Sequence, residues 1–117
     1  MTFDLPMPPP VNNLFATDFR TKRRFKSKAY ATWQKVAGET LAAQYAAYGG
    51  LSVHRPVALT IRLGLNYQSD IANREKAITD LLVANLDMPD DRYIERIVIE
   101  RDQSIQGAIV TIEGSAM

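Results

Sequence analysis

Acidic side chains in two separated segments are the residues best suited to chemistry. Asp70 follows a segment that predicts a strand, and Asp90-Asp91 precede the next one. Carboxylates from two segments can converge on a hard cation such as Mg²⁺, which prefers oxygen ligands and keeps several waters. One such water can attack a phosphodiester while the metal offsets charge in the transition state. The pattern therefore indicates a metal-assisted site for phosphoryl transfer, with Lys76 as a nearby cation.

Each of these signals also has a simpler structural interpretation. Asp70 is suited to cap the first turn of a helix by accepting hydrogen bonds from free backbone N–H groups. Asp90-Asp91 follow Pro89 in a segment with the composition of a type I turn. Lys76 and Asp80 stand four residues apart and are expected to form an ordinary helical ion pair. No signal in this set is specific by itself.

A basic segment lies toward the amino-terminal end of the chain. Its six bases, with no acid between them, are Arg20, Lys22, Arg23, Arg24, Lys26 and Lys28. Such a segment can follow a phosphate backbone, and Phe19, Phe25 and Tyr30 are available for packing or stacking. The alternative is a solvated loop. The charge is unevenly distributed, because residues 1–35 hold seven bases and two acids whereas residues 66–102 hold nine acids and five bases.

Composition limits the class of protein. The 117 residues, 46% hydrophobic and 23% charged, fit one globular domain over residues 1–117. The chain has no cysteine, which excludes disulfide frameworks and thiolate chemistry and favours a cytoplasmic setting. No stretch approaches the roughly 20 apolar residues that cross a bilayer, and residues 1–10 lack a signal-peptide pattern, so we expect no membrane partner.

Periodicity predicts the elements that must position these residues. Alternating apolar residues predict strands over residues 1–5, 57–65, 92–100 and 107–113. Helical spacing predicts one helix from a Ser27 cap to Gly49-Gly50 and another over about residues 70–86. Residues 15–26 are expected to form an exposed loop ending in a hairpin, and the last two strands an antiparallel hairpin.

The resulting order is β-α-β-α-β-β. It predicts an α+β, two-layer fold in which two helices cover one face of a small mixed sheet. An uncovered sheet face or edge favours pairing with a second copy of the chain, so we expect a homodimer.

Two segments resemble a known family. Residues 5–13, Leu-Pro-Met-Pro-Pro-Pro-Val-Asn-Asn, resemble the L-P-x-P-P-S-x-N-x signature of RusA-type Holliday junction resolvases. Residues 70–76, Asp-Ile-Ala-Asn-Arg-Glu-Lys, are similar to the family's D-x-D-N-x-x-K. Asp80 and Asp90-Asp91 stand at the expected distances, so the similarity spans nearly the whole chain.

The resemblance implies a homodimeric, Mg²⁺-dependent endodeoxyribonuclease, with Mn²⁺ as an alternative metal. Such an enzyme binds four-way DNA junctions and introduces paired nicks in recombination and repair. The implied metal ligands are Asp70, Asp90 and Asp91, and the implied catalytic residues are Asp70, Lys76 and Asp91. Residues expected to contact nucleic acid are Asn12, Asn13, Asn73 and the six bases of residues 20–28.

Ala72 departs from the pattern, because the family carries an aspartate at this position. A methyl group can neither ligate Mg²⁺ nor orient its water. A substitution made to trap a DNA-bound form and a natural loss of activity both remain open. Two other hypotheses therefore accompany the nuclease: a non-catalytic protein that binds branched DNA, and a small dimeric module whose basic loop docks acidic proteins.

Overall fold

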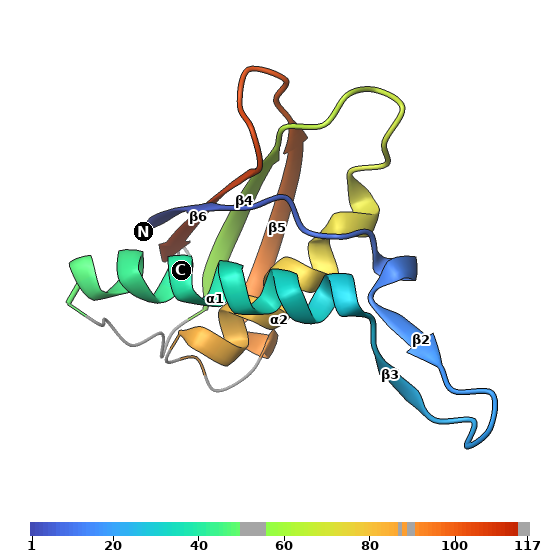
Figure 1. Ribbon diagram of the computed structural model, residues 1–117. Helices are drawn as coiled ribbons and strands as arrows, with labels where there is room; N and C mark the ends of the chain where they lie inside the picture. The colour runs from blue at the N-terminus through green and yellow to red at the C-terminus, as the bar shows by residue number, and fades with distance from the viewer. Residues whose placement is uncertain (50–55, 87, 89–90, 115–117) are drawn as a thin grey trace.

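The computed structural model describes residues 1–49, 56–86, 88 and 91–114 (Figure 1). Within these residues, a four-stranded sheet has the order β1-β6-β4-β5, and two further strands, β2 and β3, form a separate hairpin. The strands are β1 (Thr2–Leu5), β2 (Phe15–Thr17), β3 (Arg24–Lys26), β4 (Val57–Leu63), β5 (Ile94–Arg101) and β6 (Ala108–Gly114). The helices are α1 (Lys28–Ala47) and α2 (Glu75–Asn85), with 3₁₀ turns η1 (Val11–Asn13), η2 (Ala72–Arg74) and η3 (Asp91–Tyr93).

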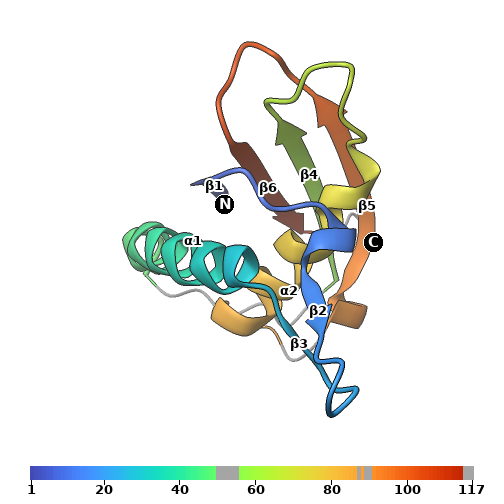
Figure 2. The same cartoon turned by 45° about the vertical axis from the view of Figure 1, so that its right-hand side comes forward.

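Both helices pack against the same face of the sheet (Figure 2). Along β4, the side chains of Val57, Leu59, Ile61 and Leu63 are buried, whereas the residues between them are only partly covered. This alternation places one apolar face against the helices, as the period of two predicts. The predicted α+β fold with a small mixed sheet under two helices is confirmed.

Helix α1 protects the outer edge of β1. Ser27 caps α1 as predicted, because its hydroxyl oxygen accepts the N–H of Tyr30 at 3.1 Å. Near the other end, the Gln44 side chain accepts the N–H of Asp4 at 2.8 Å and donates to its carbonyl at 2.7 Å. The Tyr48 hydroxyl accepts the N–H of Thr2 at 3.1 Å. These side chains satisfy backbone groups that an edge strand otherwise leaves to water or to another chain.

The predicted hairpin between the last two strands is wrong, because β4 lies between β5 and β6. Strand β4 pairs in parallel with β5 and antiparallel with β6. The connection over residues 102–107 crosses the end of β4. There the backbone N–H of Asp102 donates to Leu63 O and the backbone N–H of Gly64 donates to Gly107 O, each at 2.9 Å. A segment of this length easily spans two strand spacings of about 4.8 Å each. Its polar composition is therefore equally suited to a hairpin loop and to this crossing.

The β2–β3 hairpin projects from the body of the molecule (Figure 1). Its loop is closed by hydrogen bonds from Asp18 N to Arg23 O at 2.9 Å and from Lys22 N to Asp18 O at 2.7 Å. Lys22 adopts a left-handed conformation with φ of 57°. The hairpin expected within residues 15–26 is confirmed.

No helix in the described part of the chain combines the length and the apolar character needed to span a membrane.

Candidate functional site

Asp70 ends the loop that leads into η2 and α2. Its side chain is exposed, and its Oδ1 accepts the N–H of Ala72 at 2.9 Å. Because Arg74 N also donates to Ile71 O at 3.3 Å, the chain first turns as the 3₁₀ segment η2. Regular helix begins only at Glu75, so the predicted start at Asp70 is wrong by five residues. Asp70 thus satisfies one free backbone N–H, as its structural interpretation predicts, but the cap positions are Ile71 for η2 and Arg74 for α2. Its Oδ2 has no donor among the described residues.

Two further residues of the 70–76 motif, Asn73 in η2 and Lys76 in the first turn of α2, follow Asp70. The Oδ1 atom of Asn73 is buried and has no hydrogen-bond partner among the described residues. Lys76 Nζ lies 3.2 Å from Asp80 Oδ2, with the two side chains 49% and 42% exposed. This is the predicted i,i+4 ion pair. Surface pairs of this kind contribute only about 0–1 kcal/mol, so Lys76 is readily released toward another anion.

Of the second group of acids, Asp91 alone belongs to the described part of the chain. Asp90 lies outside the described residues, as does Pro89 of the predicted turn. Asp91 is the first residue of η3, and η3 packs against α2. The predicted strand over residues 92–100 therefore begins at Ile94, because residues 91–93 form η3. Convergence of the Asp70 and Asp91 carboxylates stays a prediction.

The described part of the chain contains no group of three Asp, Glu, His or Cys side chains placed to hold a metal. It does supply two oxygen donors near the start of α2, the free carboxylate oxygen of Asp70 and the unpartnered amide oxygen of Asn73. Hard, oxygen-rich donors of this kind suit Mg²⁺ or Mn²⁺. The chemistry of these donors suits part of such a site, and a divalent cation held by them together with further carboxylates stays a prediction.

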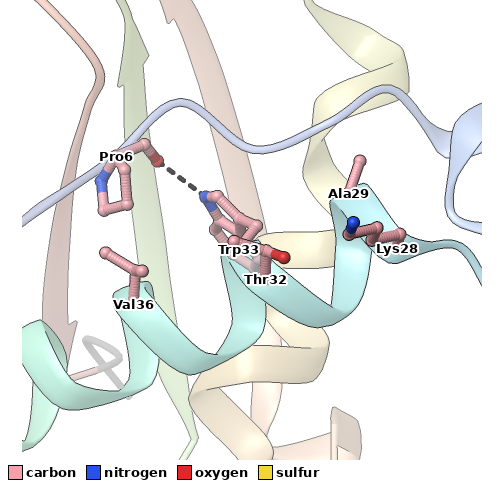
Figure 3. A pocket seen from close by; sticks show the side chains of 6 residues that line it. All are labelled: Pro6, Lys28, Ala29, Thr32, Trp33 and Val36. Carbon is pink, nitrogen blue, oxygen red and sulfur yellow. Dashed lines mark hydrogen bonds between the residues drawn. The ribbon is translucent and has the colours of Figure 1, made fainter.

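The proline-rich segment, residues 6–10, is held to α1 and to η2 through its carbonyl oxygens. Trp33 Nε1 donates to Pro6 O at 3.0 Å (Figure 3), and Arg74 Nη1 donates to Pro8 O at 2.6 Å. The segment leads into η1, which contains Asn12 and Asn13 and contacts both η2 and α2. The two sequence segments with the family resemblance thus lie side by side in the fold.

An open apolar hollow borders the same segment. It has a volume of about 540 Å³ and is lined by Pro6, Lys28, Ala29, Thr32, Trp33 and Val36 (Figure 3). Because Trp33 Nε1 is already bonded to Pro6 O, its one N–H is not available to a ligand there.

The basic hairpin is charged and largely uncompensated. The side chains of Arg20, Lys22, Arg23, Arg24, Lys26 and Lys28 are exposed, and none forms an ion pair with a described carboxylate. The Arg24 guanidinium lies 3.9 Å from the centroid of the Phe15 ring, and Lys26 Nζ lies 5.9 Å from that of Tyr30. Cation–π contacts of this type orient the two strands without neutralising their charge. Phe19 in the loop is 94% exposed.

Tyr30 of α1 packs beside this hairpin. Its buried ring packs edge-on against Phe15 at 5.8 Å and stacks on Trp33 at 6.4 Å. Burial raises the pKa of its phenol, and the Asp80 carboxylate raises that pKa further, against a hydrogen bond with Gln34 and the charge of Lys76. The phenol therefore lies within the electrostatic field of the Lys76–Asp80 pair. Of the two roles considered for Tyr30, packing and stacking on nucleic acid, the buried ring shows packing.

Two arginines were missed by sequence reasoning, which counted them only as bases. Arg74 is half-buried, which lowers its pKa, and it binds the proline-rich segment. Arg101 donates to the carbonyl oxygens of Asn66 and Ser69, with a distance of 3.0 Å for the latter, and so holds the loop before Asp70. No sequence pattern marks either arginine for this role, because each binds backbone carbonyl oxygens of residues far away in the sequence.

Comparison with protein-family models finds no match for this chain, and comparison with curated proteins finds no relative. The function is therefore argued from the residues and from the geometry of this site.

Proposed function

We propose that the chain binds branched DNA, four-way junctions in particular, and is a Mg²⁺-dependent endodeoxyribonuclease of the RusA type that introduces paired nicks. One observation carries the proposal. A projecting hairpin with five bases that form no described ion pair packs beside Tyr30 of α1, whose phenol lies in the field of the Lys76–Asp80 pair on α2. Asp70 and Asn73 lie in the loop and in the 3₁₀ turn η2 directly before α2. A phosphate backbone that follows the hairpin would thus be led toward the acidic end of the molecule.

The residues of α2 and its preceding loop have distinct proposed roles. Asp70 would hold the cation together with Asp90 and Asp91, and Asn73 would add its unpartnered oxygen or contact the DNA. When bound, Mg²⁺ or Mn²⁺ supplies an activated water and offsets charge on the phosphate. Lys76 would leave its exposed pair with Asp80 to stabilise the scissile phosphate or the leaving oxygen.

A second candidate, a junction-binding protein without chemistry, is favoured by residue 72. Ala72 contributes only its backbone N–H to Asp70, where the family pattern supplies another carboxylate. On this alternative the chain binds branched DNA but does not cut it.

The proposal includes a homodimer acting in recombination and repair, in the cytoplasm. Strand β5 has one neighbour in the described sheet, and Ile97 on it is 38% exposed. Such an edge suits contact with a second copy of the chain.

Restoration of the missing carboxylate tests the enzymatic part of the proposal. A labelled four-way junction is incubated with Mg²⁺ and either the chain, Ala72→Asp, or Ala42→Asp, which places the same charge at an exposed position on α1. We expect paired nicks with Ala72→Asp and none with Ala42→Asp. Asp70→Asn or Lys76→Ala in the Ala72→Asp background should abolish them. Absence of nicking of any branched DNA by Ala72→Asp would leave only the binding protein.

Salt dependence tests the DNA interface. Junction binding is measured from low to moderate salt for the chain, for Arg20→Gln/Arg23→Gln and for Arg96→Gln, which removes an exposed base from β5. Each lost phosphate contact lowers the slope of log affinity against log salt by about 0.9. The hairpin variant loses two bases, so the slope should become shallower by up to about twice 0.9, whereas the slope for Arg96→Gln should change little. Equal slopes for all three proteins would exclude the hairpin from the interface.

A further inference from the structure

An exposed tyrosine lies three residues before Asp70. Tyr67 is 81% exposed, the second most exposed large apolar or aromatic side chain in the described part of the chain after Phe19. The guanidinium carbon of Arg101 lies 4.9 Å from the centroid of its ring. No other described ring packs against Tyr67, so the face away from Arg101 is open.

The loop that carries this ring is ordered by its own hydrogen bonds. Arg101 donates to the carbonyl oxygens of Asn66 and Ser69, on both sides of Tyr67. Gln68 N donates to Asn66 Oδ1 at 3.0 Å, and Ser69 N donates to Asn66 O at 3.2 Å. The ring is therefore presented by a fixed turn, which reduces the entropy lost when a ligand stacks on it.

One guanidinium connects the ring to the candidate metal ligand. The Arg101 guanidinium lies over the Tyr67 ring and donates a hydrogen bond to the carbonyl oxygen of Ser69. Ser69 directly precedes Asp70 in the chain. No ion pair of Arg101 with a described carboxylate exists, so its charge is left to attract an anion. This arrangement suits one nucleotide. The aromatic face can stack on its base, the positive charge can attract its phosphate, and the carboxylate can bind that phosphate through a metal ion.

We propose that Tyr67 and Arg101 form a stacking platform for an unpaired nucleobase at the branch point of the DNA. This inference rests on the proposed function. A base within a duplex has both faces covered, whereas a base at a branch or a frayed end has a face free to stack. The platform thus favours branched DNA over linear duplex, a selectivity that the basic hairpin cannot supply because it contacts phosphates alone. Phe19 is a weaker candidate, because no described cation lies over its ring.

The test compares wild type and three variants at Tyr67 on two substrates. Wild type, Tyr67→Phe, Tyr67→Leu and Tyr67→Ala are titrated without divalent metal against a four-way junction and a linear duplex of the same sequence. A second set of junctions carries 2-aminopurine at the branch-point positions, whose fluorescence falls when the base stacks. Because Tyr67 is exposed, all variants should melt at the wild-type temperature.

We expect Tyr67→Ala to weaken junction binding by about 5- to 150-fold and duplex binding by less than about twofold. Tyr67→Phe should retain both affinity and quenching, whereas Tyr67→Leu should lose the quenching. An equal effect of Tyr67→Ala on both substrates, or none on either, would overturn the platform while leaving the proposed function intact. Wild type that binds neither substrate would overturn both.

Discussion

Arg74→Met removes the link between the proline-rich segment and η2, the 3₁₀ turn directly before α2. Arg74 Nη1 donates to Pro8 O at 2.6 Å, and Pro8 is fully buried. A charged hydrogen bond of this kind contributes about 1.5–3 kcal/mol, and its removal leaves the Pro8 carbonyl without this donor. Methionine keeps the length and the apolar stem of the side chain, so the packing changes little.

The burial of Arg74 offsets part of this loss. Desolvation lowers the pKa of the guanidinium, and its Nε is buried without a partner among the described residues. Methionine removes both unfavourable contributions. We therefore expect the free energy of unfolding to fall by about 1–2 kcal/mol, equivalent to a melting temperature lower by roughly 3–8 °C.

Urea denaturation measures this change, and amide hydrogen exchange shows where it acts. Exchange should increase in η1 and at Met7, which has the one backbone amide hydrogen of residues 6–10, because η2 no longer holds this segment, while β4 and β6 remain protected. Lys35→Met is the matched control: it removes the same charge from an exposed site on α1 and should change stability by less than about 0.5 kcal/mol. The reasoning is refuted if Arg74→Met is as stable as this control with unchanged exchange in η1.

Three further changes test other parts of the fold. In Gly64→Ala the new Cβ would lie 2.3 Å from the carbonyl oxygen of Ile105, so urea denaturation should show a loss of about 1–3 kcal/mol, whereas Gly114→Ala, with open space around it, should be near neutral. Lys22→Gly relieves a left-handed φ of 57° worth about 1–2 kcal/mol, so amide exchange in the hairpin should slow while the salt dependence of DNA binding falls by one contact at most; faster exchange would contradict this. Hydrogen bonds from Ser104 and Arg62 lower the pKa of Asp102 from 3.8 to about 2, so its contribution to stability is present above pH 4 and is lost as the pH falls toward 2. A plot of melting temperature against pH should therefore fall less steeply over this interval in Asp102→Asn than in wild type; parallel curves would show that the pairing does not stabilise the fold.

Local patterns predicted most of the elements. The alternation from Val57 to Leu63 predicts β4 because one face of that strand is buried. Ser27 predicts the start of α1 because its hydroxyl oxygen can accept a hydrogen bond from a free backbone N–H of the first turn, here that of Tyr30. The error at Asp70 is also local in origin. Its side chain bonds to the N–H of Ala72, and this competes with the regular helix that the apolar spacing predicts.

Pairings between distant segments were not predictable in the same way. The neighbour of β6 depends on which strand edge is left unpaired by the rest of the sheet. The polar connection over residues 102–107 is compatible both with β6 beside β5, as in a hairpin, and with β6 beside β4, as observed. Arg74 reaches a carbonyl 66 residues away, and Arg101 reaches one 35 residues away. Any exposed base has the same sequence signature as these two arginines, so their role in the candidate site is visible only in three dimensions.

The proline-rich segment explains why two distant motifs can serve one site. Prolines have no backbone N–H, so residues 8–10 cannot join a strand as donors and offer only carbonyl oxygens. Trp33 of α1 donates to the carbonyl oxygen of Pro6, and Arg74 of η2 donates to that of Pro8, which holds the segment to both elements. Asn12 and Asn13 are thereby placed on η1 beside η2, close to the turn that carries Asn73. The physical value of the prolines therefore lies in delivering η1 to the candidate site, and the residues that hold them, Trp33 and Arg74, should matter for DNA binding even though neither needs to touch the DNA.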